Sequence, residues 1–230
     1  MRGSCGWFYY STYEDRAYFY IVKTFRKLLW AGTWTLTVIG VLLVLRRIGI
    51  MAGLGKWLIS PRFPFDSGLH NFPVLTIAHI TPGLIFILLG PFQFRNRRNS
   101  VPGKSRVVFI IASYTIGISA LVMPFVVLPL GGLNEAVASS FFAIYFLVSI
   151  TMSLRNMNQP GLRWEWLLRA YAVGLAIATV RPIMALSFVF FGLKPETFLG
   201  TAFWIGFSLH AITAEVWINL KRTPPIATVW

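Results

Sequence analysis

Five ionisable side chains fall inside long apolar stretches of this 230-residue sequence: His79, Arg169, Arg181, His210 and Glu215. An ionisable group in hydrocarbon costs a few kcal/mol or more, so such groups usually face the interior of a helix bundle. Two membrane histidines can serve as the axial ligands of a b-type haem. His79, His210 and Arg181 are therefore candidate contacts of a haem or a quinone.

The depth of these residues tests the haem hypothesis. At a rise of about 1.5 Å per residue, Arg181 and His210 each lie about 18 to 20 Å from the same membrane face, and His79 about 10 Å. A haem needs ligands at similar depth, so this difference counts against it. Small residues at four-residue spacing mark the faces that pack against other helices. On the second span, Gly83 and Gly90 share such a face with His79. On the fifth span, Ala170, Gly174 and Ala178 precede Arg181 on one face, and on the sixth, Ala202, Gly206 and Ala214 share a face with His210.

A purely structural interpretation accounts for the same residues. Arg181 precedes Pro182, and a proline frees a backbone carbonyl that the guanidinium can bind. The histidines can bond to neighbouring hydroxyls such as Thr76, Thr81 or Thr213. Arg169 and Glu215 lie closer to the end of the bundle that carries most of the Lys and Arg residues, which we call the basic edge. Snorkelling or an interfacial ion pair explains their presence there. We therefore predict a structural polar role for Arg169 and Glu215.

The elements that position these residues follow from composition. Hydrophobic residues make up 56% of the chain, charged residues 12%, and the mean hydropathy is +0.67, whereas soluble domains carry about 25% charged residues. A helix needs about 20 apolar residues to cross a bilayer. The sequence predicts an all-α, polytopic membrane bundle of six spans at Leu28 to Leu45, Phe72 to Phe94, Val107 to Leu130, Ala136 to Leu154, Trp164 to Leu193, and Thr197 to Leu220. The sequences GGLNE and KPE are the predicted turns of two helical hairpins.

The basic charge is distributed unevenly across these spans. The chain has 21 Lys and Arg against 7 Asp and Glu. Fourteen of the 21 fall on one side, five on the other, including Arg46 and Arg47 just after the first span, and two inside the fifth span. Basic residues are retained on the cytoplasmic side, so both termini should face the cytoplasm or an equivalent compartment of a bacterial or organellar inner membrane. Basic edges favour anionic phospholipids and other membrane subunits as partners, rather than nucleic acid.

The chain divides into three parts. Residues 1–27 form an aromatic and basic segment, either an interfacial helix or an early start of the first span. Residues 28–222 form the transmembrane domain, and residues 223–230 a short tail. The loop from Gly49 to Asn71 is expected to lie across the outer rim.

No complete catalytic motif is present. The sequence has one cysteine and lacks HExxH, CxxC, GxxxxGK[ST] and GxSxG, so we expect no catalytic residues and no metal site. The leading hypothesis is a non-catalytic membrane subunit or scaffold, an accessory component of a larger energy-transducing complex that binds lipids and partner helices. The alternatives are a b-type haem- or quinone-associated redox protein, and a small transporter. A transporter predicts a hydrated cavity at Arg181.

The motif HITPGLIFILLGPFQF (His79 to Phe94) resembles the prokaryotic domain-of-unknown-function 2306 family of small polytopic membrane proteins. The stretches Arg163 to Ile183 and Trp204 to Trp217 fit the same family. Two family histidines are missing, because this chain has VPGKSR at the entry to the third helix and Arg163 before the Trp-x-x-Arg element. The resemblance implies the same helical fold and draws attention to His79, Arg169, Arg181 and Glu215.

Overall fold

The computed structural model describes residues 5–53, 71–94, 103–127 and 129–222, with side chains from residue 20 onward. These residues form six α-helices and no strand. The helices are α1 (Cys5–Met51), α4 (Pro73–Gln93), α5 (Gly103–Val126), α6 (Gly132–Arg155), α7 (Pro160–Phe191) and α8 (Pro195–Arg222). All six are long and apolar enough to cross a membrane. The prediction of an all-α, multi-pass membrane protein is confirmed.

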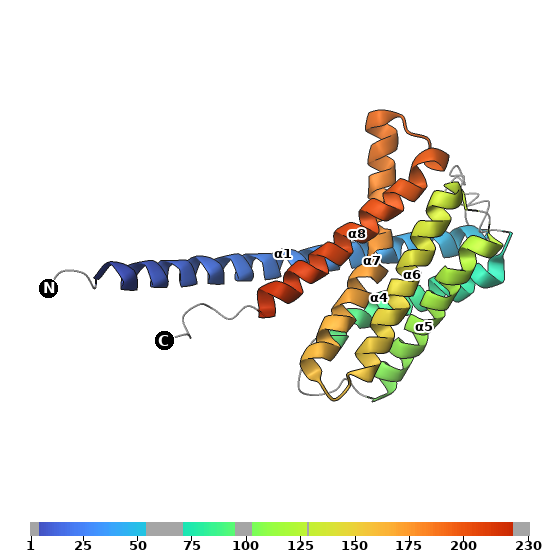
Figure 1. Cartoon of the computed structure of the whole chain (residues 1–230). Helices are drawn as coiled ribbons and strands as arrows, with labels where there is room; N and C mark the ends of the chain where they lie inside the picture. The colour runs from blue at the N-terminus through green and yellow to red at the C-terminus, as the bar shows by residue number, and fades with distance from the viewer. Residues whose placement is uncertain (1–4, 54–70, 95–102, 128, 223–230) are drawn as a thin grey trace.

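The first helix starts much earlier than the predicted span. α1 is continuous over 47 residues, about 70 Å at the usual helical rise, and its N-terminal part projects far beyond the other helices (Figure 1). Residues 13–27 therefore continue the spanning helix without a break. The central part of the predicted outer loop, residues 54–70, and the tail at 223–230 lie outside the described residues.

The far end of α1 corrects the placement of two arginines. Arg46 and Arg47 were expected just after the first span, but the helix continues through them to Met51. The residues that follow them, Ile48 to Met51, are mostly apolar and continue the helix. Arg47 is only 6% exposed, so it belongs to the interior of the bundle.

Both hairpin turns are short, and the first is displaced from its predicted place. α5 ends at Val126 and α6 begins at Gly132, so most of GGLNE is helical. The Glu135 carboxylate accepts a hydrogen bond from the Gly131 backbone N–H at 2.7 Å, which satisfies a donor at the helix start. In the second hairpin, Gly192 ends α7 with a φ of +63°, a left-handed conformation that favours glycine.

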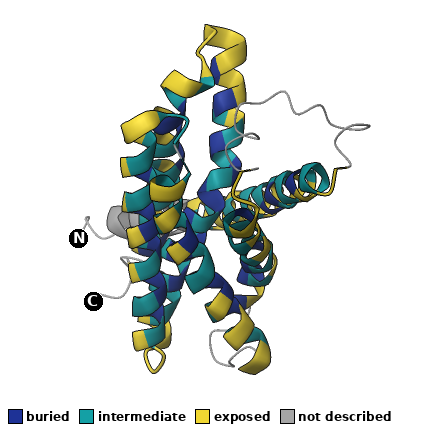
Figure 2. Ribbon diagram, turned by 90° about the vertical axis from the view of Figure 1, so that its right-hand side faces the viewer, coloured by how far each residue is buried: buried dark blue, intermediate teal, exposed yellow. Residues whose placement is uncertain are grey.

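Consecutive helices from α4 to α8 pack against one another, and α8 also packs on α6. α1 crosses α4 and α7 and lies at the edge of the bundle (Figure 1). Only 11% of an apolar 18-residue stretch of α1 is buried, against 39% of the corresponding stretches of α6 and α7. Figure 2 shows buried residues between the helices and exposed residues on their outward faces and at their ends.

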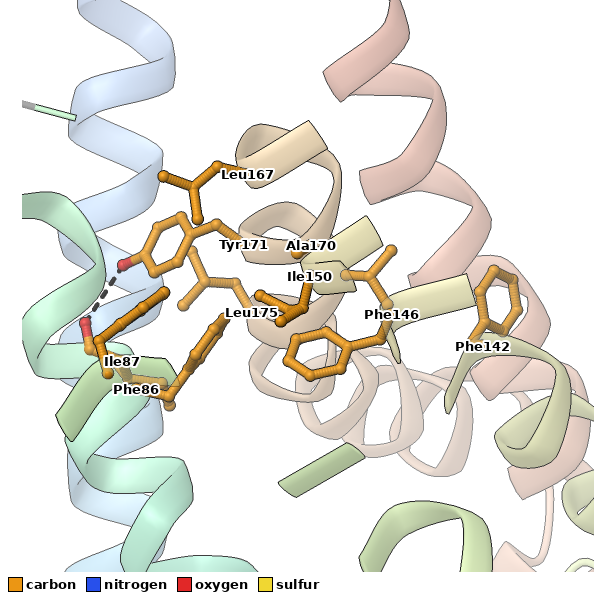
Figure 3. Packing of buried hydrophobic residues seen from close by; sticks show 11 residues of the cluster. Phe86, Ile87, Phe142, Phe146, Ile150, Leu167, Ala170, Tyr171 and Leu175 are labelled. Atoms are coloured by element: carbon orange, nitrogen blue, oxygen red, sulfur yellow. Dashed lines mark hydrogen bonds between the residues drawn. The ribbon is translucent and has the colours of Figure 1, made fainter. Parts of the chain in front are cut away.

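Four rings from four helices form the centre of the core, and we call them the aromatic layer: Phe86, Phe109, Phe146 and Tyr171 (Figure 3 labels all but Phe109). Phe86 is 1% exposed and its ring centroid lies 5.1 Å from that of Phe109 and 5.3 Å from that of Phe146. The Tyr171 hydroxyl donates to the Ile87 carbonyl at 3.2 Å (Figure 3). These contacts join α4, α5, α6 and α7.

The predicted small-residue faces of α7 and α8 are confirmed as packing faces. Gly174 lies against the Phe86 ring, and a Cβ there would come within 2.4 Å of that ring. Gly206 packs on Val180 in the same way, at 2.8 Å. Ala170, Ala178 and Ala202 are fully buried. The helices approach closely because these positions lack bulk.

Gly90 and Gly83 on α4 offer a matched test of this packing. A Cβ at Gly90 would lie 1.9 Å from the Tyr171 ring, whereas one at Gly83 meets nothing within 4 Å. Gly90→Ala should reduce the free energy of unfolding by about 1–3 kcal/mol through overpacking. Gly83→Ala should be neutral or slightly stabilising, because alanine favours helix. Thermal unfolding of the purified protein measures both, and equal midpoints would contradict the close approach of α4 and α7.

Candidate functional site

A cavity of about 450 Å³ lies between the helices, in the half of the bundle away from the basic edge. Residues from all six helices line it. Its walls are mostly apolar, and five phenylalanines contribute to them: Phe86, Phe142, Phe146, Phe203 and Phe207. Phe86 and Phe146 also belong to the aromatic layer, which therefore forms the floor of the cavity. The polar and ionisable side chains on the walls include Thr76, His79, Ser139, Arg46, Arg47, Arg181 and Glu135.

The charges on the cavity wall are predominantly positive. Among the described lining residues there are three arginines and one carboxylate. Arg181 comes from the middle of α7, and Arg46 and Arg47 from the last turns of α1. Glu135 acts electrostatically on Arg181 and partly offsets its charge. Charges act more strongly between low-dielectric walls than in water, so the excess of positive charge favours an anionic group in this cavity.

His79 lines the cavity and bonds to α5. Its Nδ1 lies 2.9 Å from the Ser119 hydroxyl oxygen, and that hydroxyl donates to the Thr115 carbonyl at 2.6 Å. The direction of the hydrogen bond between His79 and Ser119 depends on the tautomer of the imidazole.

His210 occupies a different place. Its Nε2 lies 2.8 Å from the Thr179 hydroxyl on α7, which confirms that residues 181 and 210 sit at similar depth. His210 is not among the residues that line the cavity. The structure thus brings His79 and Arg181 to one cavity and leaves His210 outside it. A haem held by both histidines stays a prediction.

Arg169 and Glu215 form a two-pronged ion pair between α7 and α8. Arg169 donates from Nε to one carboxylate oxygen at 2.5 Å and from Nη2 to the other at 2.9 Å. The guanidinium also lies 4.5 Å from the centre of the Trp166 ring. Neither Arg169 nor Glu215 lines the cavity. Their geometry is that of a structural clamp that holds the two helices in register.

The basic edge of the same helix pair carries further contacts. Arg222 donates two hydrogen bonds to the Glu165 carboxylate. The Lys221 ammonium lies over two indole rings, 4.4 Å from Trp164 and 4.7 Å from Trp217. Aromatic rings combined with snorkelling cations are typical of the membrane interface. These residues therefore mark where α7 and α8 meet the headgroups.

Three charged residues of the cavity were not among the sequence candidates: Arg46, Arg47 and Glu135. The first uninterrupted apolar run ends at Leu45, so the sequence places the two arginines just outside the first span. The run IGIM after Arg47 is the signal that the helix continues. Glu135 belongs to GGLNE, a predicted turn, and its position near Arg181 depends on how α6 packs on α7, which no local pattern reveals.

No protein-family model, curated protein or solved structure matches this chain. The resemblance to the domain-of-unknown-function 2306 family stays a prediction. The residues on which it rests do lie together in part, since Trp166, Arg169 and Glu215 form one cluster.

Removing the acidic half of the clamp should reveal its strength. Glu215→Gln leaves the Arg169 side chain, which is 13% exposed, without its counter-charge, and we expect a loss of about 2 kcal/mol in unfolding free energy. Glu165→Gln is the matched control: its partner Arg222 is 53% exposed, so the loss should stay below about 1 kcal/mol. Thermal unfolding compares the two variants, and an equal loss would argue against a specific role for Arg169 and Glu215.

Proposed function

We propose that this integral membrane protein binds an amphiphilic anion, with the apolar body of the ligand among the phenylalanines of the cavity and its anionic head at Arg181. The observation that carries this proposal is the coincidence of one cavity of about 450 Å³ with three arginines on its wall. The size lies within the range of ordinary ligand sites, about 300–1,000 Å³.

The composition of the walls supports an amphiphile. Small-molecule sites are mostly apolar with a few convergent polar groups that orient the ligand. The phenylalanines provide the apolar surface, and Arg181 with His79 provides the polar end. A fully polar solute would leave the aromatic rings in contact with water, and a pure hydrocarbon would place apolar atoms against the charged arginines.

The floor of the cavity favours binding over conduction. The aromatic layer separates the cavity from the basic edge, and the Phe86 ring at its centre is almost completely buried. A ligand that enters from the less basic side therefore meets packed rings before it can cross. We therefore propose that the protein holds its ligand within one half of the membrane.

The first experiment compares three probes: a 12-carbon carboxylate, the corresponding alcohol and a short-tailed benzoquinone. Titration calorimetry of the purified chain should give at least tenfold tighter binding for the carboxylate than for the alcohol. Arg181→Gln should abolish this difference, since about 1.4 kcal/mol of charge interaction corresponds to a factor of ten. His210→Gln, which alters a residue outside the cavity, should leave it intact. Preference for the benzoquinone, or for the alcohol, would contradict the anionic head.

A second variant blocks the cavity without disturbing the core. Gly83 lines the cavity and a Cβ there meets nothing within 4 Å, so Gly83→Val places its methyl groups in open space. We expect weaker carboxylate binding with an unchanged thermal midpoint. Gly83→Ala adds one carbon and should reduce the affinity less, so the pair forms a graded control.

A separate observation favours the accessory-subunit hypothesis as a second candidate. α1 crosses the edge of the bundle, and its N-terminal part extends beyond the other helices (Figure 1). This projection places a continuous helix where a neighbouring subunit could pack. We propose it as the contact with a larger membrane complex.

Truncation of residues 5–19 tests this second candidate. The remaining α1 retains its candidate span from Tyr20 to Met51, so the bundle should fold as before. Native mass spectrometry of the protein extracted in mild detergent should show a complex for the full chain and a monomer for the truncated chain. A monomer in both cases would refute the subunit hypothesis and leave the cavity proposal unaffected.

A further inference from the structure

A second, smaller pocket lies at the basic edge of the bundle, on the opposite side of the aromatic layer from the cavity. The ends of four helices surround it. Gln93 is the last residue of α4, Arg106 lies in the first turn of α5, and Arg163 in the first turn of α7. The final turns of α6 form the remaining wall. We call this space the edge pocket.

The edge pocket contains buried hydrogen-bond donors with no acceptor. The Gln93 side chain is 6% exposed, and its amide nitrogen has no partner among the described residues. The Nε and Nη2 atoms of Arg106 are also buried and have no hydrogen-bond partner within the part of the chain that the structure describes. A buried donor without an acceptor destabilises the folded state, and more so when it is charged. The pocket therefore presents several donors to whatever enters it.

The electrostatics of the edge pocket point the same way. Arg106 and Arg163 both line it, and their positive charges repel each other. No carboxylate is among the described residues that line it. The described wall thus supplies two guanidinium groups and an amide donor with no negative partner. An oxyanion would accept from these donors and neutralise the repulsion at the same time.

We propose that the edge pocket binds a phosphate group through Arg106, Arg163 and Gln93. The volume of the pocket is about 20 Å³, enough for about one water-sized group. One phosphate oxygen enters, while the rest of the group stays at the mouth. Because the pocket lies at the helix ends on the basic side, a phospholipid headgroup reaches it at its own depth. Free phosphate in solution is the other source of the same chemistry.

The test measures the thermal midpoint of the full chain in detergent with phosphatidylglycerol, with phosphatidylcholine and with inorganic phosphate. Binding to the folded state raises the midpoint. We expect phosphatidylglycerol to raise it by several degrees, and Arg106→Gln and Arg163→Gln each to remove this rise. A rise with inorganic phosphate of the same size identifies free phosphate as the source, and a rise with phosphatidylglycerol alone identifies the lipid.

Arg155→Gln is the matched control, since Arg155 ends α6 on the same side, is exposed and does not line the pocket. It should keep the full rise. With no anion present, Arg106→Gln should unfold at the same temperature as the wild type or higher, because it removes a buried charge without a counter-charge. Three results would each overturn the proposal. The first is an equal loss of the phosphatidylglycerol-dependent rise in Arg106→Gln and Arg155→Gln, and the second is no rise with either phosphate source. The third is a thermal midpoint that Arg106→Gln lowers in every condition.

Discussion

The packing of Phe86 against the rings of three other helices is the contact on which the rest of the bundle depends. Phe86 fits between Phe109, Phe146 and Tyr171 because Gly174 leaves room for its ring. In a membrane, burial from water does not drive helices together, so close packing of such rings and small residues carries the association. The aromatic layer also divides the interior into two spaces, and each functional proposal concerns one of them.

Polar contacts act on either side of this layer with different purposes. Towards the basic edge, the Arg169–Glu215 clamp is complete, with both oxygens of the carboxylate engaged. In the cavity, three arginines and one glutamate are among the described lining residues, so positive charge predominates there. At the edge pocket, the buried donors of Arg106 have no acceptor among the described residues. Satisfied polar groups hold helices together, whereas buried donors without an acceptor define where an oxyanion gains most.

Hydropathy and small-residue spacing were sufficient to predict six helices and the packing faces around Gly174 and Gly206. These features depend on local patterns with a fixed period. The partner of His79 could not be predicted, because Ser119 lies 40 residues away and meets it only through the register of α4 on α5. The cavity itself was equally inaccessible, since it combines the end of α1 with the middle of α7. Volumes between helices depend on the tertiary arrangement, which no single segment encodes.

The closed floor of the cavity has an electrical consequence. A ligand that reaches Arg181 from the less basic side travels partway through the bilayer and stops at the aromatic layer, so its charge crosses a fraction of the transmembrane voltage. One elementary charge moved through 100 mV changes in free energy by about 2.3 kcal/mol. In the orientation that the charge asymmetry predicts, the compartment beyond the floor is the negative one. An energised membrane would then oppose entry of the proposed anion, and loss of the voltage would fill the cavity.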